Sequence, residues 1–173
     1  YEVPNTPDEL IPYLYLINNT QLQGFKARLE AVFEKVQSMT TNRVRCLKCY
    51  LCVHKIFRLV GLYSSKFFRS VEEMWDAAYS LVSSYLEYIG AEIPPRKGEN
   101  YISDELVLLA VEVLLQSPPS SQLDTETQSE DQIPSQFEIE NYKAYSQRIL
   151  FCIGLLEFAL EKSPHNNYFK QKL

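Results

Sequence analysis

The sequence predicts an all-α protein, a helical-repeat segment of tetratricopeptide-like solenoid type with six to seven helices. Apolar side chains recur every three to four positions along most of the chain, which is the helical period. Only five glycines interrupt 173 residues, and no alternating strand pattern of useful length is present. Near the end, small residues at Cys152 and Ala159, with Leu156 between them and Pro164 after them, follow the tetratricopeptide spacing.

Helix-capping signals place the elements in order. Thr6-Pro7-Asp8-Glu9 and Ser70-Val71-Glu72-Glu73 are capping boxes, and Ser103 precedes two acidic residues as a further cap. Gly90 is expected to end the helix that Ser70 begins. The apolar face expected for that helix consists of Val71, Met74, Trp75, Ala78, Tyr79, Val82, Tyr85, Leu86 and Ile89. The expected helices span about residues 6–17, 20–40, 42–62, 70–89, 103–116 and 138–163 (the last one helix or a pair), and another begins at Asn166.

These elements predict one domain with an interruption. Residues 1–116 and 138–173 form the helical-repeat segment, and 117–137 form a disordered acidic insertion rich in Ser, Thr, Gln and Pro. A helix that begins after Pro164 would lack the neighbour that a repeat supplies. We therefore expect the chain to be a piece of a longer helical protein.

Charge is divided unevenly although the net value is only −5. Eight basic residues and no acidic residue lie between Lys35 and Arg69. In the helix at 42–62, the basic side chains fall on the side opposite one apolar stripe. That stripe consists of Cys46, Cys49, Tyr50, Val53, Ile56, Phe57 and Val60. Such a face is either simply solvated or meets phosphates or an acidic partner. The candidate partner-binding residues are Arg45, Lys48, Lys55, Arg58, Lys66 and Arg69.

The cysteines invite a metal-site hypothesis that helix geometry opposes. Cys46, Cys49 and Cys52 recur every third residue in a run without Gly or Pro, with Cys152 as a possible fourth ligand. On a helix they would fan out and climb about 9 Å, so they could not share one tetrahedral centre. Reduced thiols that fill the core are the favoured interpretation.

No arrangement of catalytic groups is evident. His54, placed beside the basic face, and His165 lack a nucleophile or carboxylate partner in any recognisable pattern, and no Gly-rich phosphate loop is present. We expect no enzyme activity, cofactor or small-molecule substrate for this chain. Charges break every apolar run before the ~20 residues that a bilayer needs, so no membrane contact is expected. Four cysteines without a visible signal peptide are most simply reduced thiols, so a cytoplasmic protein is expected.

Three stretches resemble the auxiliary, non-catalytic subunit of the NatB N-terminal acetyltransferase complex. They are LCVHKIFRLVGL from Leu51, ISDELVLLAVEVLLQ from Ile102 and LLEFALEKSPHNNYFKQKL from Leu155, in the order found in that family. The acidic insertion departs from the family pattern, because a short connection between helices is expected there.

The resemblance implies a scaffold and not a catalyst. Helical repeats of that family wrap a small catalytic acetyltransferase subunit, which holds acetyl-CoA, and help place it at the ribosome. The complex would acetylate nascent chains that start Met-Asp, Met-Glu, Met-Asn or Met-Gln. The basic helix would then meet this partner or ribosomal RNA. A generic tetratricopeptide adaptor unrelated to acetylation is the alternative function.

Overall fold

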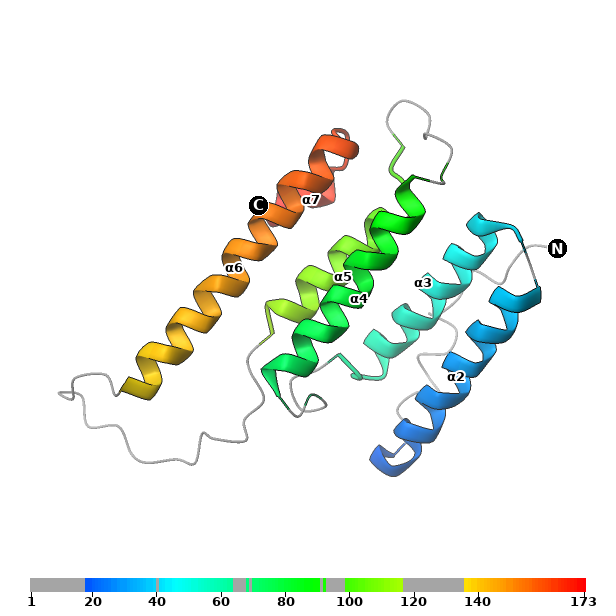
Figure 1. Ribbon diagram of the computed structural model, residues 1–173, viewed down its shortest axis with the longest axis horizontal. Coiled ribbons are helices and arrows are strands. Elements are labelled where there is room, and N and C mark those ends of the chain that lie inside the picture. Colours follow the sequence, from blue (N-terminus) through cyan, green and yellow to red (C-terminus); the bar gives the residue numbers. More distant parts are fainter. Residues whose placement is uncertain are drawn as a thin grey trace.

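The fold is all-α, as predicted. The structure is a computed structural model, and it describes residues 18–39, 41–63, 68, 70–90, 92, 99–116 and 136–173. These residues form six helices and no strand (Figure 1): α2 Asn19–Met39, α3 Arg43–Leu59, α4 Val71–Ile89, α5 Asp104–Leu114, α6 Gln136–Lys162 and α7 Asn167–Lys172. The helix expected at 6–17 lies outside the described residues, as does the insertion up to residue 135.

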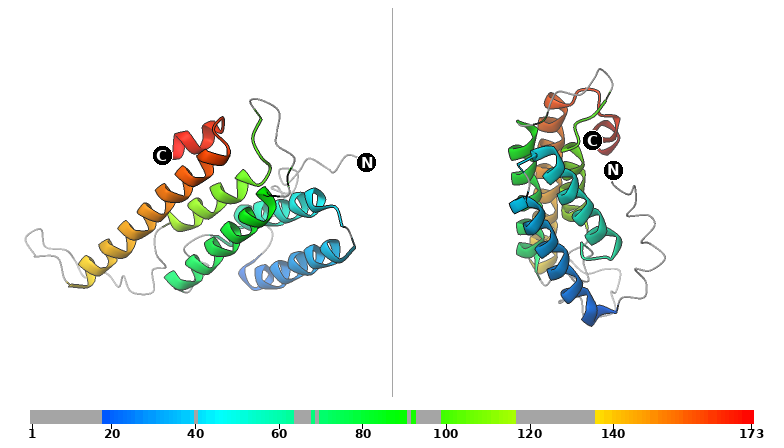
Figure 2. Two further views of the ribbon diagram at one scale, coloured as in Figure 1. Left: turned by 45° about the horizontal axis from the view of Figure 1, so that its top comes forward. Right: turned by 90° about the vertical axis from the view of Figure 1, so that its right-hand side faces the viewer.

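The helices pack in chain order. Each makes its main contacts with the helix before it and the helix after it, from α2 to α7. Figure 1 shows α2 at one end of the row and α6 at the other, with α3, α4 and α5 between them, and Figure 2 shows the same row from two other sides. Serial packing of this kind is what a helical repeat requires, because each element buries its apolar face against its neighbours.

The core is densest around α5. This helix is apolar on nearly all sides, so it can be buried between α4 and α6 rather than facing solvent on one side. The largest side chains without measurable exposure come from four helices, α3, α4, α5 and α7: Leu47, Met74, Leu81, Tyr85, Leu106, Leu114 and Phe169.

The apolar stripe expected on α3 is only partly correct. Cys46, Val53, Ile56 and Phe57 are buried as expected, but Leu47 and Leu51 are buried as well, and Cys52 is exposed. Because α3 packs on both α2 and α4, its buried face is wider than a single stripe and is turned away from Cys52.

The expected face of α4 also needs a correction. Ser70 caps the helix as predicted, since its Oγ accepts a hydrogen bond from the Glu73 amide at 3.3 Å. Tyr79 and Leu86 were expected inside but are exposed, whereas Leu81 and Tyr88 are buried. The core contacts of α4 are therefore rotated away from the Tyr79 side of the helix.

Ser103 was expected to cap the beginning of α5, but its side chain makes no capping hydrogen bond. A carboxylate from the preceding segment takes the free donors instead. Glu92 Oε2 accepts from the Ile102 amide and Oε1 from the Ser103 amide, both at 2.9 Å. At the other end of α5, the buried Arg148 of α6 donates from Nη1 to the Gln116 carbonyl oxygen at 3.0 Å.

Candidate functional site

A groove of about 580 Å³ lies where α3, α5 and α7 meet. These three helices alternate in the chain with α4 and α6, so the groove lies on one side of the helical row. Both polar and apolar side chains line it. The main contributors are Lys55 and Arg58 from α3, Tyr101 from the preceding loop, Glu105, Leu108 and Glu112 from α5, and Tyr168, Gln171 and Lys172 from α7.

Two ion pairs cross the groove from α3 to α5. Lys55 Nζ pairs with Glu105 Oε2, and Arg58 Nε lies 2.9 Å from Glu112 Oε2. All four side chains are partly open to solvent, so each pair stabilises the fold by about 0–1 kcal/mol. Their main structural effect is to hold the two helices at a fixed separation along this wall of the groove.

The structure therefore divides the predicted basic surface. Lys55 and Arg58 lie in the groove with their charges partnered by α5. Arg45 and Lys48 are exposed on α3 outside the groove lining, and among the described residues neither forms an ion pair. The other two candidates, Lys66 and Arg69, lie outside the described residues.

A buried polar cluster closes one end of the groove, and sequence reasoning missed it. The Asp104 carboxylate, at the first residue of α5, accepts from Ser163 Oγ at 2.9 Å and from Asn166 Nδ2 at 2.8 Å. Asn166 Oδ1 in turn caps α7 by accepting from the Tyr168 and Phe169 amides. One carboxylate thus joins the start of α5 to the turn between α6 and α7.

Asp104 is an unusual anchor because it is almost wholly buried. Burial raises the pKa of its carboxyl above the ordinary value, and the hydrogen bonds from Asn166 and Ser163 oppose that change. The sequence had suggested only a favourable first-turn charge. Its partners are 59 and 62 residues away, so no local signal could have identified them.

His54 is half-buried and packs among aromatic side chains of α3 and the turn that follows it. Its Nδ1 is hydrogen-bonded to the Tyr63 hydroxyl, and its ring packs edge-on against Tyr50 and Phe57. Burial lowers its pKa from 6.5 to about 4, and the nearby Lys26 charge adds to that effect. A neutral, enclosed imidazole of this kind fastens α3 to the turn that follows it.

The cysteines do not converge. Cys46 and Cys152 are buried in the core, Cys49 is half-buried and Cys52 is exposed, and all four are free thiols. In the described part of the chain, no group of three or more His, Cys, Asp or Glu side chains could hold a metal ion. Nor, in that part, is any helix long and apolar enough to span a bilayer.

A comparison with family models shows the family to which this chain belongs. Residues 7–173 match the family model described as the N-acetyltransferase B complex (NatB) non catalytic subunit. No curated protein and no solved structure matched. Two of the three stretches that resemble this family, from Ile102 and from Leu155, meet in space at the cluster of Asp104, Ser163 and Asn166.

The match spans nearly the whole chain and assigns it an auxiliary role, so the chain is not itself the catalytic enzyme. It also separates the chain from adaptors unrelated to acetylation. The chain belongs to the family of non-catalytic subunits of the NatB N-terminal acetyltransferase complex.

Proposed function

We propose that this chain is a helical-repeat scaffold that wraps the catalytic acetyltransferase subunit of NatB and anchors it to the ribosome in the cytoplasm. Family membership supports an acetyltransferase partner. The observation that carries the proposal further is the groove of α3, α5 and α7, since three helices from successive parts of the chain contribute to one recessed surface. Recessed surfaces of stacked helices are the binding surfaces of repeat proteins.

The groove has the composition of an interface with a polar rim. Tyr168 stands exposed at its edge and Leu108 lies partly buried within it, so an apolar contact is available between charged walls. Large aromatic side chains at such positions contribute most of the energy of many interfaces. The ion pairs of Lys55 and Arg58 keep the wall in place before the partner arrives.

Co-purification tests this part of the proposal. Tyr168→Glu and Leu108→Glu, in the auxiliary subunit expressed with the NatB acetyltransferase, should reduce the recovered acetyltransferase by about tenfold or more. Tyr79→Glu on α4 is the matched control, because it places the same charge on an exposed tyrosine outside the groove. Equal recovery from all three variants would contradict the assignment of the groove.

Ribosome anchoring is assigned to the basic residues of α3. Arg45 and Lys48 are the better candidates for phosphate contacts, because Lys55 and Arg58 already face carboxylates. Lys66 and Arg69 extend the same charge run in the sequence. Arg45→Glu with Lys48→Glu should lower co-sedimentation with ribosomes, and the loss should be larger at low salt because the contact is electrostatic.

A test of whether Lys55 contributes to ribosome binding needs a variant that preserves its ion pair. Reversing Lys55 alone would also break its ion pair with Glu105, so a loss of binding would be ambiguous. Exchanging both charges, Lys55→Glu with Glu105→Lys, keeps the pair but removes the positive charge from α3. If the exchanged variant sediments with ribosomes as the unaltered protein does, Lys55 has no part in anchoring.

A further inference from the structure

The side of the molecule formed by α4 and α6 exposes large apolar side chains that no described part of the chain covers. Tyr79 is 72% exposed and Leu86 is 51% exposed on α4, and Leu150 is 68% exposed on α6. Phe151 and Phe158 on α6 are also exposed. Neither α4 nor α6 contributes to the groove, so this apolar face is separate from the proposed acetyltransferase site.

The two helices present one continuous face. Trp75, Tyr79, Val82 and Leu86 are spaced by four, three and four residues and therefore form one stripe on α4. Trp75 meets Phe151 of α6 edge-to-face, with ring centroids 5.1 Å apart, so the α4 stripe joins the α6 residues. Figure 1 shows α4 and α6 running in the same direction, which keeps the face aligned along both helices.

On α6, no neighbouring atom fills the space beside Gly154. Gly154 lies between Phe151 and Phe158 in the sequence, and a Cβ added to it would meet no atom within 4 Å. Trp75 and Val82 pack against the core but are only partly buried, so part of each side chain faces solvent on this side. A partner side chain can therefore approach between the aromatic rings without displacing the core.

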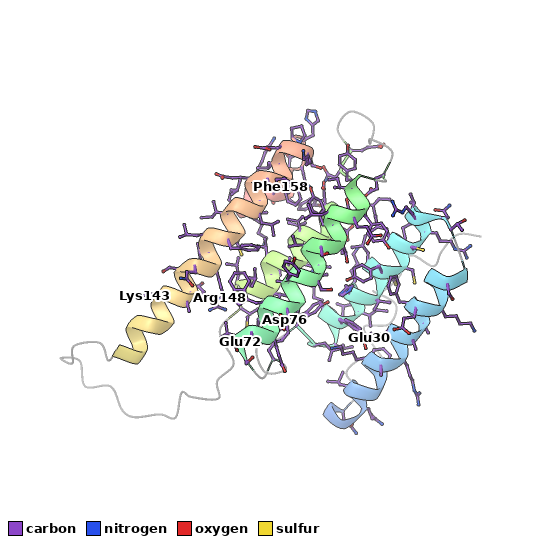
Figure 3. The ribbon with its side chains drawn as sticks, viewed as in Figure 1. Glu30, Glu72, Asp76, Lys143, Arg148 and Phe158 are labelled. Atoms are coloured by element: carbon purple, nitrogen blue, oxygen red, sulfur yellow. The ribbon has the colours of Figure 1, made fainter. Side chains whose placement is uncertain are left out.

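Charge around the face identifies the chemistry of the partner. Glu72 and Asp76 are exposed on the first turns of α4, and Glu157 and Glu161 are exposed one turn apart on α6, so carboxylates outnumber the exposed Lys143 and Lys162 of α6 by four to two. Figure 3 shows Glu72 and Asp76 along the start of α4 and Phe158 near the end of α6. An apolar centre flanked by carboxylates complements an apolar stripe flanked by Lys or Arg.

One aromatic ring of the face already has a cation beside it within α6. Lys162 of α6 places its Nζ 5.6 Å from the centroid of the Phe158 ring. An ammonium or guanidinium group at this distance from an aromatic face is attracted by the ring. Exposed Tyr79 and Phe151 offer further rings of the same kind.

We propose that the α4/α6 face (Trp75, Tyr79, Leu86, Leu150, Phe151 and Phe158 with their flanking carboxylates) docks a basic amphipathic helix of a protein other than the catalytic subunit. Its apolar residues, spaced three and four apart, lie along the aromatic stripe, and its Lys or Arg residues meet the acidic residues of both helices. This surface goes beyond the proposed function, because neither acetyltransferase binding nor ribosome anchoring requires it.

The test uses the full-length auxiliary subunit bound to its acetyltransferase and three synthetic 18-residue peptides. The first is a Leu/Lys helix with one apolar stripe, the second has Glu in place of each Lys, and the third is a scramble of the first. Titration calorimetry should show saturable binding of the first peptide alone. Tyr79→Ser with Leu150→Gln should weaken it by about tenfold or more.

Two further variants complete the design. Glu72→Lys with Asp76→Lys should also weaken the basic peptide and allow the acidic one to bind. Val32→Ser is the matched control, because Val32 is an exposed apolar residue of α2 outside the face, and it should change nothing. Equal binding of the scramble, absence of binding, or self-association that Tyr79→Ser abolishes would each overturn the proposal, the last by showing that a second copy covers the face.

Discussion

The groove side and the α4/α6 side of this molecule use opposite chemistry. In the groove, Lys55 and Arg58 are partnered by Glu105 and Glu112 of the same chain, and Asp104 is satisfied by buried hydrogen bonds. On the α4/α6 face, by contrast, aromatic and aliphatic side chains are exposed without a cover among the described residues. The most basic helix of the described chain is therefore partly neutralised by carboxylates of α5, whereas no described residue covers the apolar surface of α4 and α6.

Removing the buried carboxylate should show the largest effect on the groove side. Asp104→Ala leaves the Ser163 hydroxyl and the Asn166 amide buried without their acceptor, and we expect a loss of about 2–3 kcal/mol in the free energy of unfolding. Urea denaturation followed by circular dichroism measures it. Glu105→Ala, one residue further along, is the control and should lose under about 1 kcal/mol.

The free energy of unfolding should depend on pH through His54, on the packed side of α3. Because folding lowers the pKa of His54 from 6.5 to about 4, the unfolded chain takes up this proton more readily than the folded one. The stabilising contribution is complete above pH 6.5 and falls as the pH drops toward 4, by up to about 3 kcal/mol. His54→Phe should flatten this part of the stability profile, and an unchanged slope would contradict the burial of His54.

The ion pairs across the groove should contribute little to stability. Arg58→Ala should lower the free energy of unfolding by under about 1 kcal/mol, because both partners keep contact with water. The Arg58 and Glu112 single and double variants form a cycle whose coupling energy should shrink as salt rises. A coupling that salt leaves unchanged would mean that the pair is less hydrated than its exposure indicates.

Changes on the α4/α6 face should have the smallest effect on stability. Tyr79→Ser and Leu150→Gln alter side chains that are mostly in water. Each should therefore change the free energy of unfolding by no more than ~0.5 kcal/mol, with a correspondingly small shift in melting temperature. A large loss of stability from either change would show that these residues are covered by another part of the protein. Thermal melts of both variants beside Met74→Ala, a core control, make the comparison direct.

Sequence patterns predicted the elements better than their orientation. The Ser70 capping box, the turn at Pro164 and the Asn166 cap are local signals, and each was found where expected. Which face of α4 is buried depends on where α5 lies, and the period of the sequence alone could not distinguish Leu81 from Tyr79. The apolar residues of α4 cover so wide an arc of the helix that either the Leu81 side or the Tyr79 side could have faced the core.

The candidate site was predictable only in part, for a similar reason. The basic character of α3 is visible in the sequence, but its partial neutralisation by Glu105 and Glu112 depends on pairing across some fifty residues. The cluster around Asp104 has no local signature at all. Long-range polar contacts of this kind depend on the packed helices and cannot be found from periodicity.

The buried Arg148 has a consequence for how the chain tolerates length variation. By donating to the Gln116 carbonyl oxygen, it fixes the exit of α5 against the side of α6, so the register of these two helices is set by their own contacts. A change in the number of residues between Gln116 and Gln136 should therefore leave this contact between α5 and α6 in place.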